Sequence, residues 1–138
     1  MKYMILTYAS QRDCDAAALK PNGDAVWSAQ DFAAMGAYME AFNRELSESG
    51  ELVETRALAP PIHTRRLQTR GGAPVVTDGP FAETTEVLAS YWIVECESFD
   101  RATAIAARLS ACPLPPELAA RACADVRPIY EHHDELEP

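Results

Sequence analysis

Apolar residues recur at spacings of three and four between residues 28 and 50, which predicts an amphipathic helix of about five turns. Ser28 precedes this stripe and Asp31 follows three residues later, the spacing of a capping box that satisfies the free N–H groups of a first turn. Ser49 and Gly50 end the helix. The apolar stripe consists of Phe32, Met35, Met39, Phe42 and Leu46.

A second helix is predicted behind Ser98, which can cap it, with Asp100 in its first turn. Proline residues between Cys112 and Pro116 break this helix, and Pro116 suits the first position of a short third helix to about Ala122. The apolar stripe of the second helix consists of Ala102, Ile105, Ala106 and Leu109.

Runs rich in β-branched and aromatic residues predict the strands of a sheet. A glycine pair, Gly71-Gly72, predicts a hairpin turn between the third and fourth runs. Residues 9–27 carry a turn signal, Pro21-Asn22-Gly23-Asp24, and are predicted to be a connecting loop. The predicted strands cover residues 2–8, 52–58, 62–70, 74–77, 91–96 and 126–130.

This order of elements predicts an α+β domain, an antiparallel sheet with both long helices on one face. Strands 2–8 and 91–96 are apolar on both faces, as the neighbours Tyr3 and Met4 illustrate. Because two helices cover only one face, the other face would expose several large side chains. Packing against a second copy would bury them, so the sequence predicts a homodimer that encloses a ligand cavity.

Length and charge narrow the range of functions. The 138 residues fit one domain, expected over 1–130, and an acidic tail follows over 131–138. A net charge of −9 disfavours direct binding to nucleic acid. No apolar run approaches the roughly 18 residues that span a bilayer, so we expect no membrane partner and a cytoplasmic location. The four cysteines show no zinc-site spacing, which predicts reduced, mostly buried thiols.

The segment 77–86 contains the sharpest local signal, the turn Asp78-Gly79-Pro80. In one interpretation the Asp78 carboxylate only caps its own turn, while glycine and proline fix the backbone. In the other, the turn presents Asp78 to the predicted cavity, where a carboxylate could give or take a proton.

This turn and its surroundings resemble the DGPF branch of the YCII-related family. The likeness begins with Asp78-Gly-Pro-Phe81 and extends over nearly the whole chain, apart from residues 9–27 and the acidic tail. The matching stretches are Met1–Leu6, Ala41-Phe42 with Leu46 and Gly50, Leu58-Ala-Pro60, Tyr91-Trp-Ile-Val94, Ser98–Leu109 and Val126-Arg-Pro128. The resemblance implies a ferredoxin-like fold and a dimeric α/β barrel.

For function, the resemblance implies two possibilities. Some YCII-related proteins, a dehydrochlorinase among them, are enzymes with a His–Asp pair, and Asp78 matches that aspartate. The resemblance places the histidine of the pair early in the first predicted helix. Residues 27–50 contain no histidine, so it has no match in this chain. Thr85 replaces a common lysine of the branch, and Ala89-Ser90 replace a glycine pair. Relatives of this branch are often encoded beside extracytoplasmic-function sigma factors, which implies an accessory role in transcription control.

Several other side chains are candidates for the predicted cavity. Arg56 and Arg127 could pair with Asp78 or an anionic ligand, or form ordinary ion pairs. His63 could reach the cavity or lie at an edge strand. The predicted ligand-binding residues are Arg56, His63, Pro80, Phe81 and Tyr91.

Metal and cofactor sites are not predicted. His132 and His133 lie next to each other in the acidic tail, a poor arrangement for one ion, and no nucleotide-binding or nucleophile motif is present. Three hypotheses remain. They are a module that binds a small ligand, a cofactor-free isomerase, lyase or hydrolase with Asp78 as general acid or base, and a structural dimer.

Overall fold

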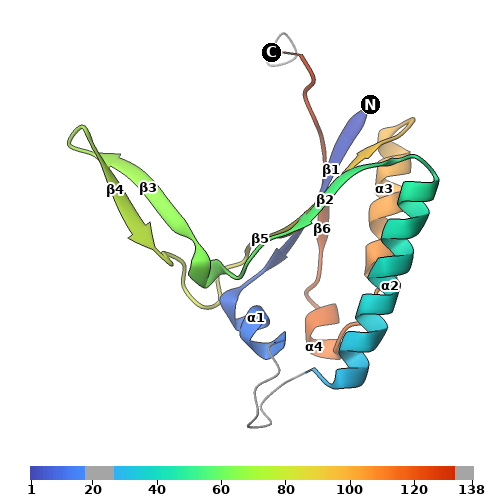
Figure 1. Ribbon diagram of the computed structural model, residues 1–138, viewed down its shortest axis with the longest axis horizontal. Helices are drawn as coiled ribbons and strands as arrows, with labels where there is room; N and C mark the ends of the chain where they lie inside the picture. The colour runs from blue at the N-terminus through green and yellow to red at the C-terminus, as the bar shows by residue number, and fades with distance from the viewer. Residues whose placement is uncertain (18–26, 133–138) are drawn as a thin grey trace.

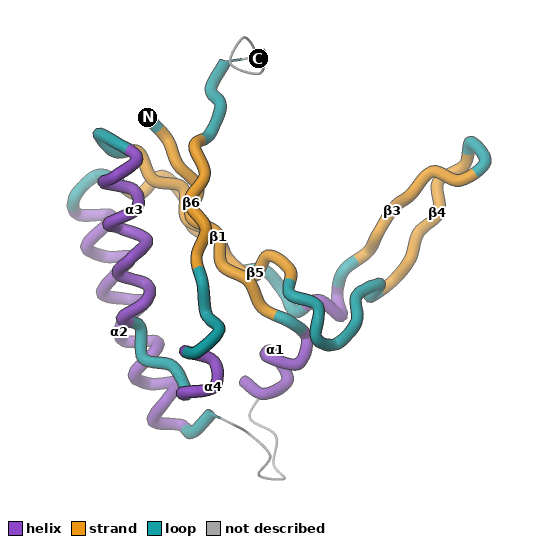
Figure 2. Tube along the Cα trace, turned by 180° about the vertical axis from the view of Figure 1, so that it is seen from behind, coloured by secondary structure: helices purple, strands orange, loops and turns teal. Residues whose placement is uncertain are grey.

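The fold is described by a computed structural model over residues 1–17 and 27–132. It is an α+β arrangement in which a sheet packs against two long helices, α2 (Ala29–Glu48) and α3 (Phe99–Ala107), that lie side by side on the same face (Figure 1, Figure 2). The strands are β1 (Lys2–Ala9), β2 (Leu52–Ala57), β3 (Arg65–Arg70), β4 (Ala73–Asp78), β5 (Val87–Glu95) and β6 (Ala124–Pro128). The α-helices are α1 (Gln11–Ala17), α2 (Ala29–Glu48), α3 (Phe99–Ala107) and α4 (Pro116–Ala119).

Four strands form one antiparallel sheet in the order β2-β5-β1-β6. The α+β class and the antiparallel sheet are confirmed, and the strand order is compatible with a ferredoxin-like fold. Strands β3 and β4 form a separate hairpin that projects away from the sheet and helices (Figure 1). The predicted turn at its tip is present, since Gly71 and Gly72 both adopt positive φ angles, which glycine tolerates best.

The hydrophobic core lies between the sheet and the two long helices. Trp92 of β5 packs edge-on against Phe42 of α2, and its Nε1–H donates to Asn43 Oδ1 at 2.8 Å. Each fully buried large apolar side chain contributes about 1.5–3 kcal/mol. The core consists of Tyr3, Ile5, Phe42, Leu46, Trp92, Val94, Ala102, Ile105 and Ala106.

The opposite face of the sheet is also partly apolar. Met4 lies opposite Ile93 in the β1–β5 register, and Leu6 lies opposite Tyr91. All four are half-buried in the single chain. We call this surface the open sheet face, because α2 and α3 both lie on the other side (Figure 2).

The capping box predicted for α2 is confirmed. Ser28 Oγ accepts from the N–H of Asp31, and the Asp31 carboxylate accepts from the N–H of Ser28. The predicted cap of α3 is present too, since Ser98 Oγ accepts from the N–H of Arg101. Pro116 begins α4, as predicted.

The prediction of a connecting loop over 9–27 is wrong for its first half, where α1 spans Gln11–Ala17. A reciprocal pair of hydrogen bonds starts this helix, from Ser10 N to the Asp13 carboxylate and from Asp13 N to Ser10 Oγ. The turn signal Pro21–Asp24 lies outside the described residues.

Smaller differences concern the ends of strands. Residues Pro61–His63 form a 3-10 turn rather than the start of a strand, because Pro60 and Pro61 fix the backbone and Ile62 N–H donates to Gln11 Oε1 at 2.8 Å. Strand β5 starts at Val87, four residues before the predicted start, and β6 begins at Ala124.

Candidate ligand-binding pocket

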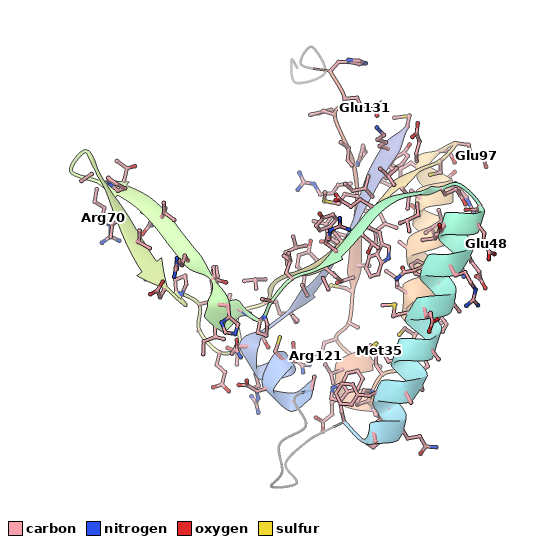
Figure 3. All side chains as sticks on the ribbon, in the orientation of Figure 1. Met35, Glu48, Arg70, Glu97, Arg121 and Glu131 are labelled. Carbon is pink, nitrogen blue, oxygen red and sulfur yellow. The ribbon has the colours of Figure 1, made fainter. Side chains whose placement is uncertain are left out.

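A cavity of about 470 Å³ lies where the first half of α2, the helix α3 and the segment 108–124 approach the end of β1. We call it the apolar pocket. Met35 and Arg121, two of its lining residues, are labelled at this end of the molecule in Figure 3. Other lining residues are Trp27, Met39, Ala107, Leu114 and Leu118.

The pocket exists because small side chains face it from α3. Ala106 and Ala107 line the cavity, whereas the larger side chains Phe42, Leu46 and Ile105 belong to the core and do not line it. Met35 and Met39 extend the apolar stripe of α2 along the pocket wall and are only half-buried. Methionine is flexible and polarizable, so this wall can adapt to ligands of different outline.

Most polar side chains of the wall are already hydrogen-bonded within the protein. The hydroxyl of Thr7 pairs with Ser90, Thr103 Oγ1 donates to the Phe99 carbonyl at 2.8 Å, and Ser110 Oγ donates to the Ala107 carbonyl at 2.6 Å. Groups satisfied in this way do not demand polar partners from a ligand. The cavity therefore favours a largely apolar occupant.

An ion pair, Asp13–Arg121, forms part of the pocket wall. Arg121 Nη2 lies 2.6 Å from Asp13 Oδ1, and the Asp13 side chain is only 10% exposed. Burial raises the pKa of Asp13, but the hydrogen bonds from Ser10 and the charge of Arg121 outweigh it, so the pKa lies below its usual value. The pair joins α1 to the segment after α4.

Trp27 forms part of the wall directly before α2. Its ring stacks on Phe32 with centroids 4.8 Å apart, and the residue is 7% exposed. Its Nε1–H is buried and has no hydrogen-bond partner among the described residues. An unpaired buried donor costs about 1–3 kcal/mol.

All four cysteines are free thiols. Only Cys112 is buried, so the expectation of mostly buried thiols holds for that residue alone. Cys112 and the exposed Cys123 both line the pocket. Burial raises the pKa of Cys112, which keeps this thiol protonated and unreactive at neutral pH.

Asp78 lies at the end of β4, at the base of the hairpin. Its side chain is 81% exposed, and its carboxylate lies 3.5 Å from Arg65 Nε across the hairpin. Gly79 N–H donates to the Thr64 carbonyl at 2.8 Å, and Gly79 has a φ of +52°, so glycine suits this turn. Asp78 does not line the apolar pocket.

The other predicted site residues fall into two groups, neither of which lines the pocket. At the hairpin base, His63 is exposed and Phe81 is half-buried beneath the Arg66 guanidinium, 4.5 Å from its ring centroid. Pro80 is half-buried beside Phe81.

On the open sheet face, Arg56 Nη2 lies 3.5 Å from Glu54 Oε1, and Tyr91 Oη donates to Glu54 Oε2 at 3.2 Å. Partial burial and this hydrogen bond raise the pKa of Tyr91. Arg127, the other arginine considered for the predicted cavity, is exposed on β6.

The pocket residues Asp13, Trp27 and Arg121 were not predicted from the sequence. The only signal was the Ser10–Asp13 spacing, which matches that of Ser28 and Asp31. Within residues 1–17 and 27–132, no cluster of three or more potential metal ligands occurs. His132 is exposed there and His133 lies outside the described residues. No helix in the same part of the chain has the length and apolar character needed to cross a bilayer.

Comparison with known proteins identifies the family of the chain. The sequence model of the YCII-related domain matches residues 1–127. A relative of Rhizobium meliloti (strain 1021), described as an uncharacterized protein, is 33% identical over 84 residues, which are 61% of this chain and 68% of the relative. The chain therefore belongs to the YCII-related family.

Proposed function

We propose that the protein is a ligand-binding module whose apolar pocket takes a small, largely apolar molecule. The observation that carries the proposal is the cavity itself, about 470 Å³ with polar wall groups that are mostly satisfied. Ligand sites commonly measure about 300–1,000 Å³ and are lined mainly by apolar side chains. Methionine and aromatic side chains on one wall suit a ring-bearing ligand.

We further propose that the module is a homodimer, with the ferredoxin-like sheets of two copies packed as an α/β barrel. The open sheet face with Met4, Leu6 and Ile93 supports this, because a second copy would bury it. The hairpin adds support. Leu67 and Val76 pair across it and are 68% and 57% exposed, and an isolated two-stranded hairpin is marginally stable without a partner.

Catalysis by Asp78 is the less favoured alternative. The Asp78 side chain is 81% exposed and pairs with Arg65 in the single chain, and it does not line the apolar pocket. The DGPF branch and an accessory role beside a sigma factor stay predictions of the sequence resemblance. A module of this kind would act there through protein contacts that respond to its ligand.

A thermal-shift titration with 2-naphthalenemethanol, an uncharged ring compound, tests the proposal. A ligand that binds only the folded state stabilises it by about 2.7 kcal/mol at one hundred times its Kd. We expect the melting temperature of the wild type to rise with probe concentration. Ala107→Phe, which fills the pocket from α3, should abolish the rise.

Ala104→Phe is the matched control, since Ala104 is exposed on the same helix and does not line the pocket. It should retain the rise. Absence of a shift in the wild type, or an equal shift in Ala107→Phe, would refute binding in the apolar pocket. A shift that Asp78→Asn alone removes would instead favour a site at the hairpin base.

A further inference from the structure

A second, polar hollow of about 270 Å³ adjoins the apolar pocket. It is lined by Ser10, Arg12, Thr84, Glu117 and Arg121, and we call it the polar hollow. Arg121 lines both cavities, so the two meet at its side chain. A single molecule could therefore occupy both, with an apolar part in one and a polar part in the other.

The polar hollow is rich in hydrogen-bond donors. A guanidinium has five N–H groups, and Arg121 uses Nη2 on Asp13 and Nε on the Glu117 carbonyl at 3.4 Å. Its other N–H groups have no hydrogen-bond partner in the described part of the chain, so a ligand can accept from them. Arg12 forms no ion pair with any carboxylate of the described residues, and Thr84, which carries a hydroxyl, lines the same space.

The backbone holds these groups together. Arg12 N–H donates to the Glu83 carbonyl at 3.0 Å, which places the segment after the Asp78 turn against α1 and brings Thr84 beside Arg12. Asp13 is buried and its charge is balanced by Arg121. Glu117 is the one carboxylate that lines the hollow, and it is exposed. Of the two arginines that line the hollow, Arg12 is therefore the one that forms no ion pair with a described carboxylate.

We propose, building on the proposed ligand-binding function, that the natural ligand is an apolar acid. Its ring-bearing or aliphatic body lies in the apolar pocket, and its carboxylate or equivalent anionic group lies between Arg12 and Arg121. Guanidinium groups bind carboxylates through charge-assisted hydrogen bonds, which are about twice as strong as neutral ones. Arg12 selects the acid over an uncharged molecule of the same shape.

Isothermal titration calorimetry with two matched probes tests this assignment. The probes are 2-naphthoate, which carries the acid, and 2-naphthalenemethanol, which has the same ring and no charge. We expect the wild type to bind the acid at least tenfold more tightly than the alcohol, with the difference shrinking as salt is raised. Arg12→Gln should lower the affinity for the acid to that for the alcohol, and the affinity for the alcohol should stay unchanged.

Arg44→Gln is the matched control, because Arg44 is exposed on α2 and lines neither cavity. It should bind both probes as the wild type does. Equal affinity of the wild type for acid and alcohol, or tight acid binding retained in Arg12→Gln, would overturn the acid assignment while leaving the pocket in place. Binding of neither probe would refute the proposed function itself.

Discussion

At the scale of single residues, Asp13 connects the fold to the pocket. Its carboxylate accepts from the backbone of Ser10, which starts α1, and pairs with Arg121, which lines both cavities. The buried Asp13 side chain thus stabilises the start of α1 and also holds Arg121 in the pocket wall. Asp78, the residue singled out by its turn, has one exposed ion pair, and such pairs contribute about 0–1 kcal/mol.

Asp13→Asn tests this role through its pH dependence. Removing one partner of a buried pair costs about 3–5 kcal/mol, but Arg121 is 51% exposed, so we expect a loss of about 1–2 kcal/mol at pH 7. Because the folded pKa is lowered, the wild type holds this stability above about pH 4 and loses it as the pH falls further. Urea unfolding from pH 7 to pH 3 should show the two proteins converging.

Glu48→Gln supplies the control, since Glu48 is exposed at the end of α2. It should follow the wild type at each pH. A difference between Asp13→Asn and wild type that stays constant down to pH 3 would contradict the ion-pair account.

At the scale of elements, α2 was predictable from the sequence and α1 was not. Helix α2 was predicted because its capping box precedes a long apolar stripe that packs on the core. Helix α1 has the same kind of box at Ser10 and Asp13, but the sequence behind it, Gln11–Ala17, has no such stripe. Helix α1 is held by polar contacts instead, and the spacing of apolar residues along the sequence does not reveal such contacts.

The apolar pocket could not be predicted for a related reason. Its outline depends on the small side chains Ala106 and Ala107 and on the meeting of α1, α2, α3 and the segment 108–124. Alanine residues carry no sequence signal for a binding site, and the way in which distant segments meet in space cannot be deduced from the residues of any one of them. The Asp78 turn was visible as a turn, since its glycine and proline specify backbone geometry, but the exposure of its carboxylate depends on where the hairpin projects.

Ser28→Ala tests the cap of the helix that forms one pocket wall. The loss of an N-cap hydroxyl costs about 1 kcal/mol, within a usual range of about 0.5–2. We expect that decrease in the free energy of unfolding, measured in urea, with cooperative unfolding retained. Ser47→Ala, an exposed change inside the same helix, should be neutral or slightly stabilising. Equal effects of the two changes would contradict the capping role.

At the scale of the whole molecule, the residues that the structure describes leave two surfaces of the single chain uncovered. They are the open sheet face and the hairpin, both with exposed or half-exposed apolar side chains. The hairpin carries three arginines, Arg65, Arg66 and Arg70, on a chain with a net charge of −9. An acidic second copy is therefore an electrostatically suitable partner for the hairpin.

Leu6→Glu should disrupt the proposed dimer, because it places a charge at the centre of the open sheet face and leaves the core residues unchanged. Analytical ultracentrifugation should give the wild type twice the mass of one chain, and the variant the mass of one. Ala33→Glu, on an exposed position of α2, should remain dimeric. A wild type that sediments as a single chain at micromolar concentration would contradict the dimer.

The claim that matters most is that the apolar pocket binds a ligand, and the two tryptophans of the chain can report on it directly. Trp27 lines the pocket, whereas Trp92 lies in the core with its indole N–H bonded to Asn43. In a ¹H–¹⁵N NMR titration with 2-naphthalenemethanol, we predict that the Trp27 indole signal shifts and saturates while the Trp92 signal stays in place. If both signals remain unchanged at high probe concentration, the pocket does not bind such ligands, which contradicts the proposed function.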